Sequence, residues 1–542
     1  MKPGRKADGL VASALAPLAS AGLLAPAMSG QSEWWPLLLA GLAPLLLLVL
    51  NARPGRSLLA GFVFGLIYHL ILLYWILIVL GHYGGLSLGL SLPALVLLAA
   101  YMACFPAASC WLIGLIASRH GNRDPSVAAL IWTAPVAWVG FDYLRSVLFT
   151  GFPWMDLGYG LFGQPMLIQA ADLGGHHLLT FSLMLVNSLA AAGLDRIGRA
   201  SRSARGGRWP ILLAVAVLAS IAGYSALRYQ TVATTLARAP KAKVAVIQGN
   251  IDQSIKWSKT FKTATIDTYL KLSQPMMREA GAELVVWPET ALPFYPQEDS
   301  LIHRVIDSFA ADKTWLLTGT PTFTVTAGED GAEQIRYFNG ALLLGPGGQV
   351  GGEYTKQHLV PFGEYVPLRS WLPFLQPLVI NVGDFSAGTE QGPLVLGAMR
   401  LGMLICYESI FPEIARESVA RGANLLVNIT NDAWYGRSSA PYQSMAMAGL
   451  RAVENRRALV RAANTGISGF VDPLGRIIDR TDIFVPAARV AAVPLLDQPT
   501  VFARGGHWFG LICLVIGASL ILGRLACRQF RLRRQWGEGK AG

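Results

Sequence analysis

The chain is poor in charge and in cysteine, and each shortage excludes a class of protein. Only 14% of its 542 residues are charged, whereas 53% are hydrophobic. A typical soluble domain has about 25% charged residues. The five cysteines provide no disulfide framework, because only Cys406 lies away from the long apolar runs, whereas Cys104, Cys110, Cys513 and Cys527 lie in or beside them. The sequence therefore excludes an ordinary soluble enzyme and a disulfide-stapled secreted domain.

Metal-ligand spacing and nucleic-acid modules are missing as well. The eight histidines are scattered, His176 and His177 are adjacent rather than at ligand spacing on a helix, and there is no cysteine pair. A formal net charge of +12 would suggest nucleic acid in a soluble protein. Here the Lys/Arg clusters flank apolar runs, where anionic lipid attracts them. We therefore expect no metal, no other cofactor and no nucleic-acid partner.

Long apolar runs divide the chain into parts in lipid and a part in water. A helix needs about 20 predominantly apolar residues to cross a bilayer. We predict an α-helical bundle of about eight spans, at 10–28, 35–50, 58–80, 88–117, 127–147, 177–194, 209–226 and 505–523. The long run 88–117 is kept as one helix in spite of Pro106. The expected domains are a membrane domain of seven helices over 1–230, a catalytic domain over 240–500, and a last helix with a basic tail over 505–542.

The basic clusters predict the orientation of these spans. With eight spans and a cytoplasmic N-terminus, every Lys/Arg cluster falls on the cytoplasmic side, as the positive-inside rule requires. Residues 240–500 then lie on the far side of the membrane, and the C-terminus is cytoplasmic. The first span could instead be a cleaved signal, since Ala25-Pro26-Ala27 is weakly like a cleavage site, and cleavage would leave the later orientations unchanged.

The stretch 240–500 has the pattern of an α/β domain with buried strands, because short apolar runs alternate with polar stretches. We predict strands at 244–248, 284–287, 315–318, 340–344, 401–405, 425–429 and 458–462. Three of these runs end in polar or reactive side chains, namely Glu289, Cys406 and Asp432. In open α/β sheets the site lies beyond the carboxyl ends of the strands.

Cys406 is the only cysteine of this stretch. Free cysteine is often a buried small hydrophobe, but an unpaired thiol directly after a strand also suits a nucleophile. Lys356 alone is typical of a solvated surface charge, and Glu289 alone of a helix N-cap. It is the combination of these two with Cys406 that indicates a reactive site.

Three motifs carry a family resemblance. Trp287-Pro288-Glu289, Lys356 with the run from His358 to Glu364, and Cys406-Tyr407-Glu408 resemble the Glu-Lys-Cys constellation of the nitrilase (carbon-nitrogen hydrolase) superfamily. With membrane spans before and after, the whole chain resembles the bacterial apolipoprotein N-acyltransferase family. The resemblance implies an αββα sandwich on the periplasmic side of the inner membrane. It also implies a general base, a cation near the oxyanion and a nucleophile, which are Glu289, Lys356 and Cys406, and supporting or substrate-binding residues, which are Glu364, Tyr407, Glu408, Trp257, Asn339 and Trp434.

The activity that the resemblance implies is a ping-pong acyl transfer. Cys406 would attack a phospholipid ester to give a thioester, and the α-amine of the diacylglyceryl-cysteine of an apolipoprotein would then take the acyl chain. Donor and acceptor follow from the resemblance alone. We further expect a monomer embedded in the membrane.

Two features near the membrane have open interpretations. The apolar segment 366–377 is either a covered surface of the domain or a lid that admits acyl chains. Polar residues near the outer ends of the spans are costly in hydrocarbon and are expected to face protein, water or headgroups, as structural pairs: Asp142, Arg145, Asp156, Asp172 and His176.

Three other functions are compatible with parts of the pattern. A membrane-anchored nitrilase-type amidase would use the same triad, and its exported domain would stay active when cut free near Lys241 and Asp497. A non-catalytic receptor on this scaffold would not need all three triad residue types. A Cys–His protease would use His358 or His303 as base, but no asparagine or aspartate partner falls in a recognisable local signature.

Overall fold

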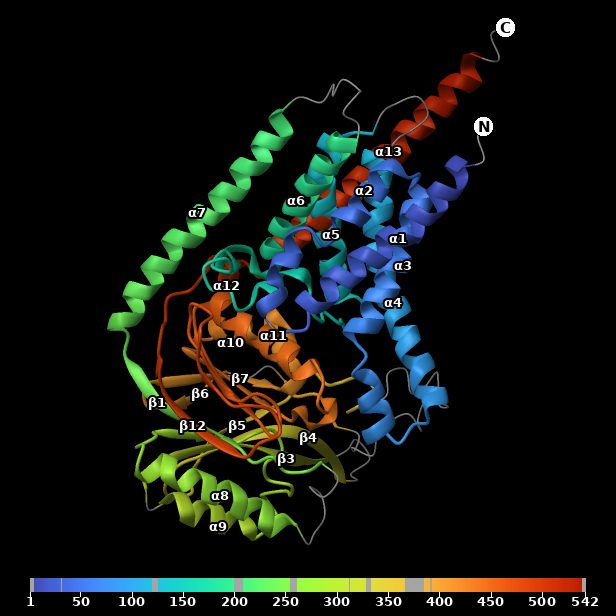
Figure 1. Cartoon of the computed structure of the whole chain (residues 1–542). Helices are drawn as coiled ribbons and strands as arrows, with labels where there is room; N and C mark the ends of the chain where they lie inside the picture. The colour runs from blue at the N-terminus through green and yellow to red at the C-terminus, as the bar shows by residue number, and fades with distance from the viewer. Residues whose placement is uncertain are drawn as a thin grey trace.

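The computed structural model describes residues 4–30, 32–118, 125–198, 208–253, 261–310, 312–327, 333–365, 385–389 and 392–538. A helical bundle stands on a two-sheet domain (Figure 1). The bundle contains the 3₁₀ helices η1 (Ser32–Leu39) and η3 (Leu157–Leu161) and the π-helix η2 (Ile78–Tyr83). Its helices are α1 (Gly4–Ala27), α2 (Ala43–Asn51), α3 (Pro54–Leu72), α4 (Leu88–Ala117), α5 (Val127–Val147), α6 (Ala171–Gly198), α7 (Trp209–Arg238) and α13 (Trp508–Glu538), with α12 (Val501–Gly505) at the junction.

Among the described residues, seven helices are long and apolar enough to cross a membrane. The remaining predicted span, 10–28, is the first along the chain and forms α1. Its apolar stretch Ala14–Ala27 falls in a shorter class of 10–17 residues. The run 88–117 is one continuous helix with Pro106 inside it, so the prediction of a single helix is confirmed. α1 begins and α13 ends at the end of the bundle away from the sheets (Figure 1).

The sheet domain is an αββα sandwich, as predicted. One sheet has the order β12-β1-β2-β3-β4-β5 and the other the order β11-β10-β9-β8-β7-β6. The strands of the first sheet are β1 (Lys241–Gln248), β2 (Leu284–Val286), β3 (Trp315–Ala327), β4 (Glu333–Leu344), β5 (Val350–Thr355) and β12 (Ala487–Pro494). Those of the second are β6 (Leu394–Leu396), β7 (Met399–Ile405), β8 (Leu425–Thr430), β9 (Ala458–Ala463), β10 (Gly469–Val471) and β11 (Ile477–Arg480).

Each sheet is parallel at its centre and antiparallel at its edges. β1, β2 and β3 are parallel neighbours, and so are β7, β8 and β9. Because parallel strands end at the same edge, the residues that follow β7 and β8 lie together. All seven predicted strands are present, while β5, β6, β10, β11 and β12 were not predicted.

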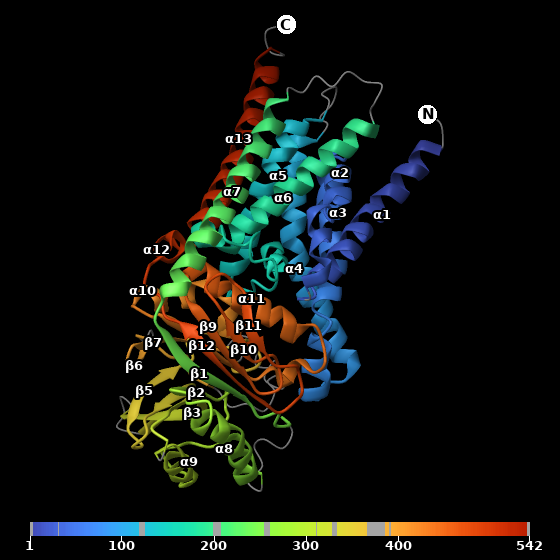
Figure 2. The ribbon, with the colours of Figure 1, turned by 60° about the vertical axis from the view of Figure 1, so that its left-hand side comes forward.

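Helices cover both outer faces of the sandwich (Figure 2). α8 (Lys262–Arg278) and α9 (Leu301–Ala310) pack on the first sheet. α10 (Pro412–Ala420) and α11 (Ala440–Asn455) lie between the second sheet and the bundle. One apolar core joins both parts, since the same cluster of buried side chains includes Leu24 and Trp154 of the bundle and Met447 of α11.

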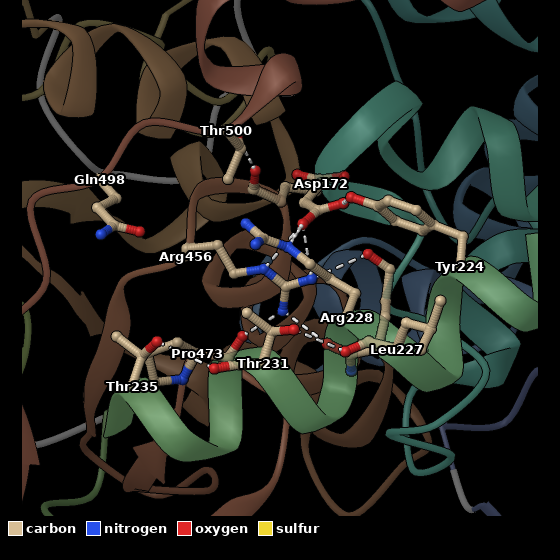
Figure 3. Close-up of polar contacts among 12 residues, drawn as sticks. Asp172, Tyr224, Leu227, Arg228, Thr231, Thr235, Arg456, Pro473, Gln498 and Thr500 are labelled. Carbon is tan, nitrogen blue, oxygen red and sulfur yellow. Dashed lines mark hydrogen bonds and ion pairs between the residues drawn. The ribbon is translucent and has the colours of Figure 1, made fainter. Parts of the chain in front are cut away.

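Helix α7 touches the rest of the protein sparsely, and a buried ion-pair network fixes its lower half (Figure 3). The carboxylate of Asp172 on α6 accepts a hydrogen bond from the Tyr224 hydroxyl at 2.8 Å and from Arg228 Nε at 2.7 Å, both on α7. It also accepts two from Arg456, which follows α11, at 2.9 and 3.1 Å. One carboxylate therefore joins α6, α7 and the sheet domain. The other polar residues expected to pair near the span ends do so as well, because Asp156 accepts from Arg145 and His176.

Replacing Asp172 with asparagine should destabilise the protein strongly. The Arg456 guanidinium is 2% exposed, and the substitution would leave its buried charge without a carboxylate. Breaking a buried pair in this way costs about 3–5 kcal/mol. The midpoint of thermal unfolding in detergent measures the effect. The matched change Asp479→Asn, at a pair with Arg489 in which both side chains are over 40% exposed, should leave the midpoint almost unchanged; an equal response of the two variants would contradict the assignment.

Candidate active site

The thiol of Cys406 lies at a sharp turn between β7 and the short helix η5 (Cys406–Ile410). Its backbone φ is 53°, in the left-handed region that non-glycine residues rarely adopt. Such conformations cost about 1–3 kcal/mol and persist where the surroundings enforce them. The turn holds the thiol at the carboxyl edge of the second sheet, half-buried and free of any disulfide.

The surroundings of the thiol favour its neutral form. Burial and the nearby Glu289 carboxylate raise the pKa of Cys406 to about 12, against the opposing effects of Lys356 and a hydrogen bond with the Thr430 side chain. A neighbouring ammonium by itself favours the thiolate. Lys356 does act in that direction, but burial and Glu289 outweigh it. Cys406 therefore rests as a thiol, and it would need a base to remove its proton in order to act as a nucleophile.

Glu289 follows β2, and two neighbours fix its carboxylate. Asn339 Nδ2 of β4 donates to Oε1 at 2.8 Å, and the backbone N–H of Asn431 donates to Oε2 at 2.8 Å. Gly319 of β3 makes room for the turn around Glu289, because a Cβ there would lie 2.5 Å from the backbone N of Thr290. These two hydrogen bonds hold the carboxylate in one orientation. One of the donors, Asn431, directly follows β8, which is the neighbour of β7, the strand that leads to the thiol.

Lys356 directly follows β5 and is 1% exposed. Its Nζ lies 2.9 Å from Glu364 Oε2 and 3.8 Å from Glu289 Oε1. Burial disfavours the ammonium, but the carboxylates of Glu364 and Glu289 outweigh this and raise the pKa of Lys356, so the side chain stays charged. Asn339 Nδ2 also donates to Glu364 at 2.8 Å. Lys356 and Asn339 together hold the two carboxylates side by side.

Glu408 connects the nucleophile turn to the lysine segment. Its carboxylate accepts backbone N–H bonds from Ile405 at 2.7 Å, Gln357 at 2.6 Å and His358 at 3.2 Å. The Tyr354 hydroxyl lies 3.1 Å from both carboxylate oxygens. Burial raises the pKa of Glu408 to about 7, and these backbone donors act against that rise. Because the side chain is fully buried and engaged on both oxygens, its contacts favour a bracing role.

Other predicted site residues face the bundle or lie outside the description. The Tyr407 hydroxyl approaches the carbonyl of Gly151, in the loop after α5, at 3.4 Å. The half-buried Trp434, in η6 (Asp432–Tyr435), has its ring 5.6 Å from Tyr83 of η2. Trp257 and the segment 366–377 lie outside the described residues. The site is therefore bordered by both parts of the protein.

The geometry gives no support to a Cys–His pair. The ring of His358 packs at a tilt against Phe411, with ring centroids 3.9 Å apart, and lies 5.8 Å from the Tyr407 ring; burial lowers the pKa of His358. His303 is exposed on α9, against the other sheet. Neither imidazole takes the place beside the thiol that Glu289 and Lys356 occupy.

One group in the described part of the chain could in principle hold a metal ion. Asp156, His176 and His177 offer ligand atoms within 4.8 Å of one another. Both oxygens of Asp156 are already engaged, Oδ1 by Arg145 and Oδ2 by His176 Nε2. A cationic Arg145 beside the group disfavours a further cation, so the arrangement is that of an ion-pair network.

Sequence comparisons find relatives of both parts of the protein, the sandwich and the bundle. The profile described as carbon-nitrogen hydrolase matches residues 243–495, and the profile described as apolipoprotein N-acyltransferase N-terminal domain matches residues 21–189. The apolipoprotein N-acyltransferase of Geobacter metallireducens is 40% identical over 501 residues, which cover 92% of each chain. The chain belongs to the apolipoprotein N-acyltransferases. The enzyme of that name from Azotobacter vinelandii is 35% identical over 510 residues, covering 93% of this chain and 94% of its own.

Membership of the apolipoprotein N-acyltransferases makes the chain a multi-pass membrane enzyme that transfers acyl groups to nitrogen.

The candidate site contains residues that the sequence reasoning did not select. Asn431 supplies a backbone donor to Glu289, and Thr430 donates to Asp432 at 2.9 Å while bonding to the thiol. The available signal was the polar end of the predicted strand 425–429, where Thr430 and Asn431 precede Asp432.

Proposed function

We propose that this N-acyltransferase moves an acyl chain from a membrane phospholipid to the α-amine of the diacylglyceryl-cysteine of an apolipoprotein. In this proposal Cys406 is the nucleophile, Glu289 the general base and Lys356 the cation that faces the developing oxyanion. Residues 240–500 form the catalytic domain, between a membrane domain over 1–230 and a terminal helix with its tail over 505–542. The names of the relatives support the acceptor class, and the position of the site against the bundle supports a lipid donor.

The observation that carries the proposal is the arrangement around the thiol. A neutral, half-buried Cys406 lies beside an oriented carboxylate and a permanently charged ammonium. A thiol whose pKa is raised to about 12 is a poor nucleophile by itself. It becomes a good one when a fixed base takes its proton during attack, and general-base assistance of this kind contributes about 10²- to 10⁴-fold.

The two half-reactions then balance as follows. In the first half, Glu289 takes the thiol proton as sulfur bonds to the ester carbonyl carbon. The resulting tetrahedral oxyanion faces Lys356 and the Tyr407 backbone N–H. The C–O bond then breaks, and Glu289 returns the proton to the departing lysophospholipid oxygen. In the second half, Glu289 takes a proton from the attacking amine, the C–S bond breaks, and the thiolate recovers the proton. Each oxyanion donor of this type is worth about 10²- to 10³-fold in rate.

We further propose that the catalytic domain faces the periplasm and that both termini are cytoplasmic. The arrangement of the bundle supports a placement of the two termini and the sandwich on opposite sides of the membrane, because α1 begins and α13 ends away from the sheets. The direction rests on the Lys/Arg clusters, which the positive-inside rule assigns to the cytoplasm.

The decisive experiment is to incubate the purified protein with a phospholipid labelled in its acyl chain. We expect label on the protein that hydroxylamine removes, and a loss of that label on adding a diacylglyceryl peptide with a free α-amine. Cys406→Ala should carry none of it. Cys513→Ala, at a buried thiol within α13, is the matched control and should label normally. Absence of label in the native protein, or equal label in Cys406→Ala, would reject the thioester route.

A further inference from the structure

A basic cavity of about 570 Å³ lies at the junction of the sandwich and the bundle. It is bordered by α10, α12 and the start of β7, on the side of the molecule away from α4 (Figures 1 and 2). Its charged lining consists of Arg400, Arg416, Arg457, Arg504 and Asp497. Four arginines therefore face one acid.

The positive charge of this cavity is only partly compensated. Arg400 pairs with Asp497, whose side chain is 70% exposed, and Arg416 pairs with the neighbouring Glu417 at 3.1 Å. Arg457 is 2% exposed and donates only to backbone carbonyls, those of Ala423, Asn455, Arg456, Asp497 and Gln498. Even with Glu417 counted, the group keeps a net formal charge of two positive.

Two of these arginines differ in their freedom to meet a ligand. Burial and the nearby Arg400 lower the pKa of Arg457 to about 10, so Arg457 remains charged at neutral pH. Because its N–H donors are already occupied, it would attract a ligand only through its positive charge. Arg504 at the end of α12 is exposed, and the described part of the chain gives its guanidinium no hydrogen bond or ion pair. Its planar fork is available for two parallel bonds to phosphate oxygens.

The cavity is separate from the thiol site. Arg400 lies at the start of β7 and Cys406 directly after its end, a distance of about 20 Å at 3.3 Å per residue. Arg457 precedes β9, which runs in the same direction as β7 and β8. The basic cavity therefore occupies the amino edge of the second sheet, opposite the catalytic edge.

Position and lining indicate where a ligand would come from. Arg504 is four residues before Trp508, where the apolar helix α13 begins, and tryptophan is typical of the membrane–water boundary. The other walls are apolar and come from Val419, Ala420, Pro499 and Ala503. Arginine forks beside small apolar side chains at this level suit a phosphate that carries a glycerol and acyl chains.

We propose that this cavity is a second lipid site, which binds the phosphate of an anionic phospholipid in the leaflet next to the catalytic domain. The surplus of positive charge disfavours a headgroup that carries an ammonium. The expected ligand is therefore a lipid with a net negative charge and not a zwitterionic one. Bound there, the lipid fixes the corner of the sandwich formed by α10 and α12 to the membrane surface and takes no part in acyl transfer.

The test titrates phosphatidylglycerol onto the full-length protein in detergent, in a Cys406→Ala background that cannot turn lipid over, with native mass spectrometry as the readout. Each arginine near a membrane surface contributes about fivefold in affinity. We therefore expect about fivefold weaker binding in Arg504→Gln and about 25-fold weaker binding in Arg416→Gln/Arg504→Gln. Phosphatidylcholine should bind weakly and equally to all forms.

Controls separate the possible sources of the phosphate and a folding defect. Arg489→Gln makes the same charge change at a half-exposed position on β12 and should bind phosphatidylglycerol like the parent. With Cys406 restored, the arginine variants should form the acyl-enzyme at the normal rate, which shows that they are folded. Unchanged lipid binding in the double variant overturns the proposal. Competition by inorganic phosphate at similar concentration also overturns it, because the site would then serve a soluble anion.

Discussion

Replacing Glu289 with glutamine should move two properties of Cys406 in opposite directions. Loss of the base should slow acyl-enzyme formation by about 10²- to 10⁴-fold. The carboxylate also raises the pKa of the thiol, so its removal should lower that pKa and enlarge the thiolate fraction at any pH below it. A small neutral alkylating reagent, which needs only thiolate, should therefore react faster with the variant at mildly alkaline pH.

The measurement pairs single-turnover acylation by a labelled phospholipid with the rate of iodoacetamide modification over a range of pH. Cys104 and Cys527 are also exposed, so both are replaced by serine in every form compared, and Cys406→Ala gives the background. If alkylation slows in parallel with acylation, Glu289 controls access or position rather than the proton, and its assignment as base fails.

Glutamine at position 408 should be almost as damaging as alanine. Both oxygens of Glu408 accept backbone N–H bonds, two on Oε1 and one on Oε2. An amide NH₂ in either place would oppose a donor, so no rotamer of glutamine satisfies the site. Hydrogen bonds to a charged group contribute about 1.5–3 kcal/mol each, and a displacement of about 1 Å in the nucleophile turn can cost about 10²-fold in rate.

Two readouts distinguish a brace from a substrate contact. Glu408→Gln should lower both the thermal midpoint and the rate of acyl-enzyme formation, with about 10²-fold expected for the rate, while the phospholipid concentration for half-maximal rate stays near that of the parent. Glu417→Gln on the outer face of α10, with its side chain 34% exposed, is the matched control. A variant of normal stability that only binds phospholipid less well would instead place Glu408 in the substrate site.

How far the sequence predicts this fold depends on burial. Longer buried strands such as β8, in which all six residues are buried, were predicted from their apolar runs, whereas the three-residue strand β10 is equally buried but too short to form such a run. In β12 the first six residues are half-buried or exposed and only the last two are buried, and β11 is exposed at three of its four positions. In such strands the backbone pairing and not the side-chain pattern determines the structure, so composition gave no signal.

The site shows a similar limit. Glu289 and Cys406 could be selected because each follows an apolar strand and matches a motif. Glu408 was selected through the resemblance, but its bracing role could not be predicted, since its partners Gln357 and His358 are 50 residues or more away in the chain. The protonation state of the thiol was also out of reach, because opposing effects of burial, Glu289 and Lys356 decide it only when their separations are known.

Helix α11 has no side that faces water, since nearly all of its residues are buried. One side packs on the second sheet and the other on the bundle, within a single apolar core. In water alone the outer helical layer of the sandwich would be left with an uncovered apolar surface. The bundle therefore supplies part of the hydrophobic core of the sandwich, and we expect a release of the sandwich from the bundle to destabilise it rather than merely to remove a tether.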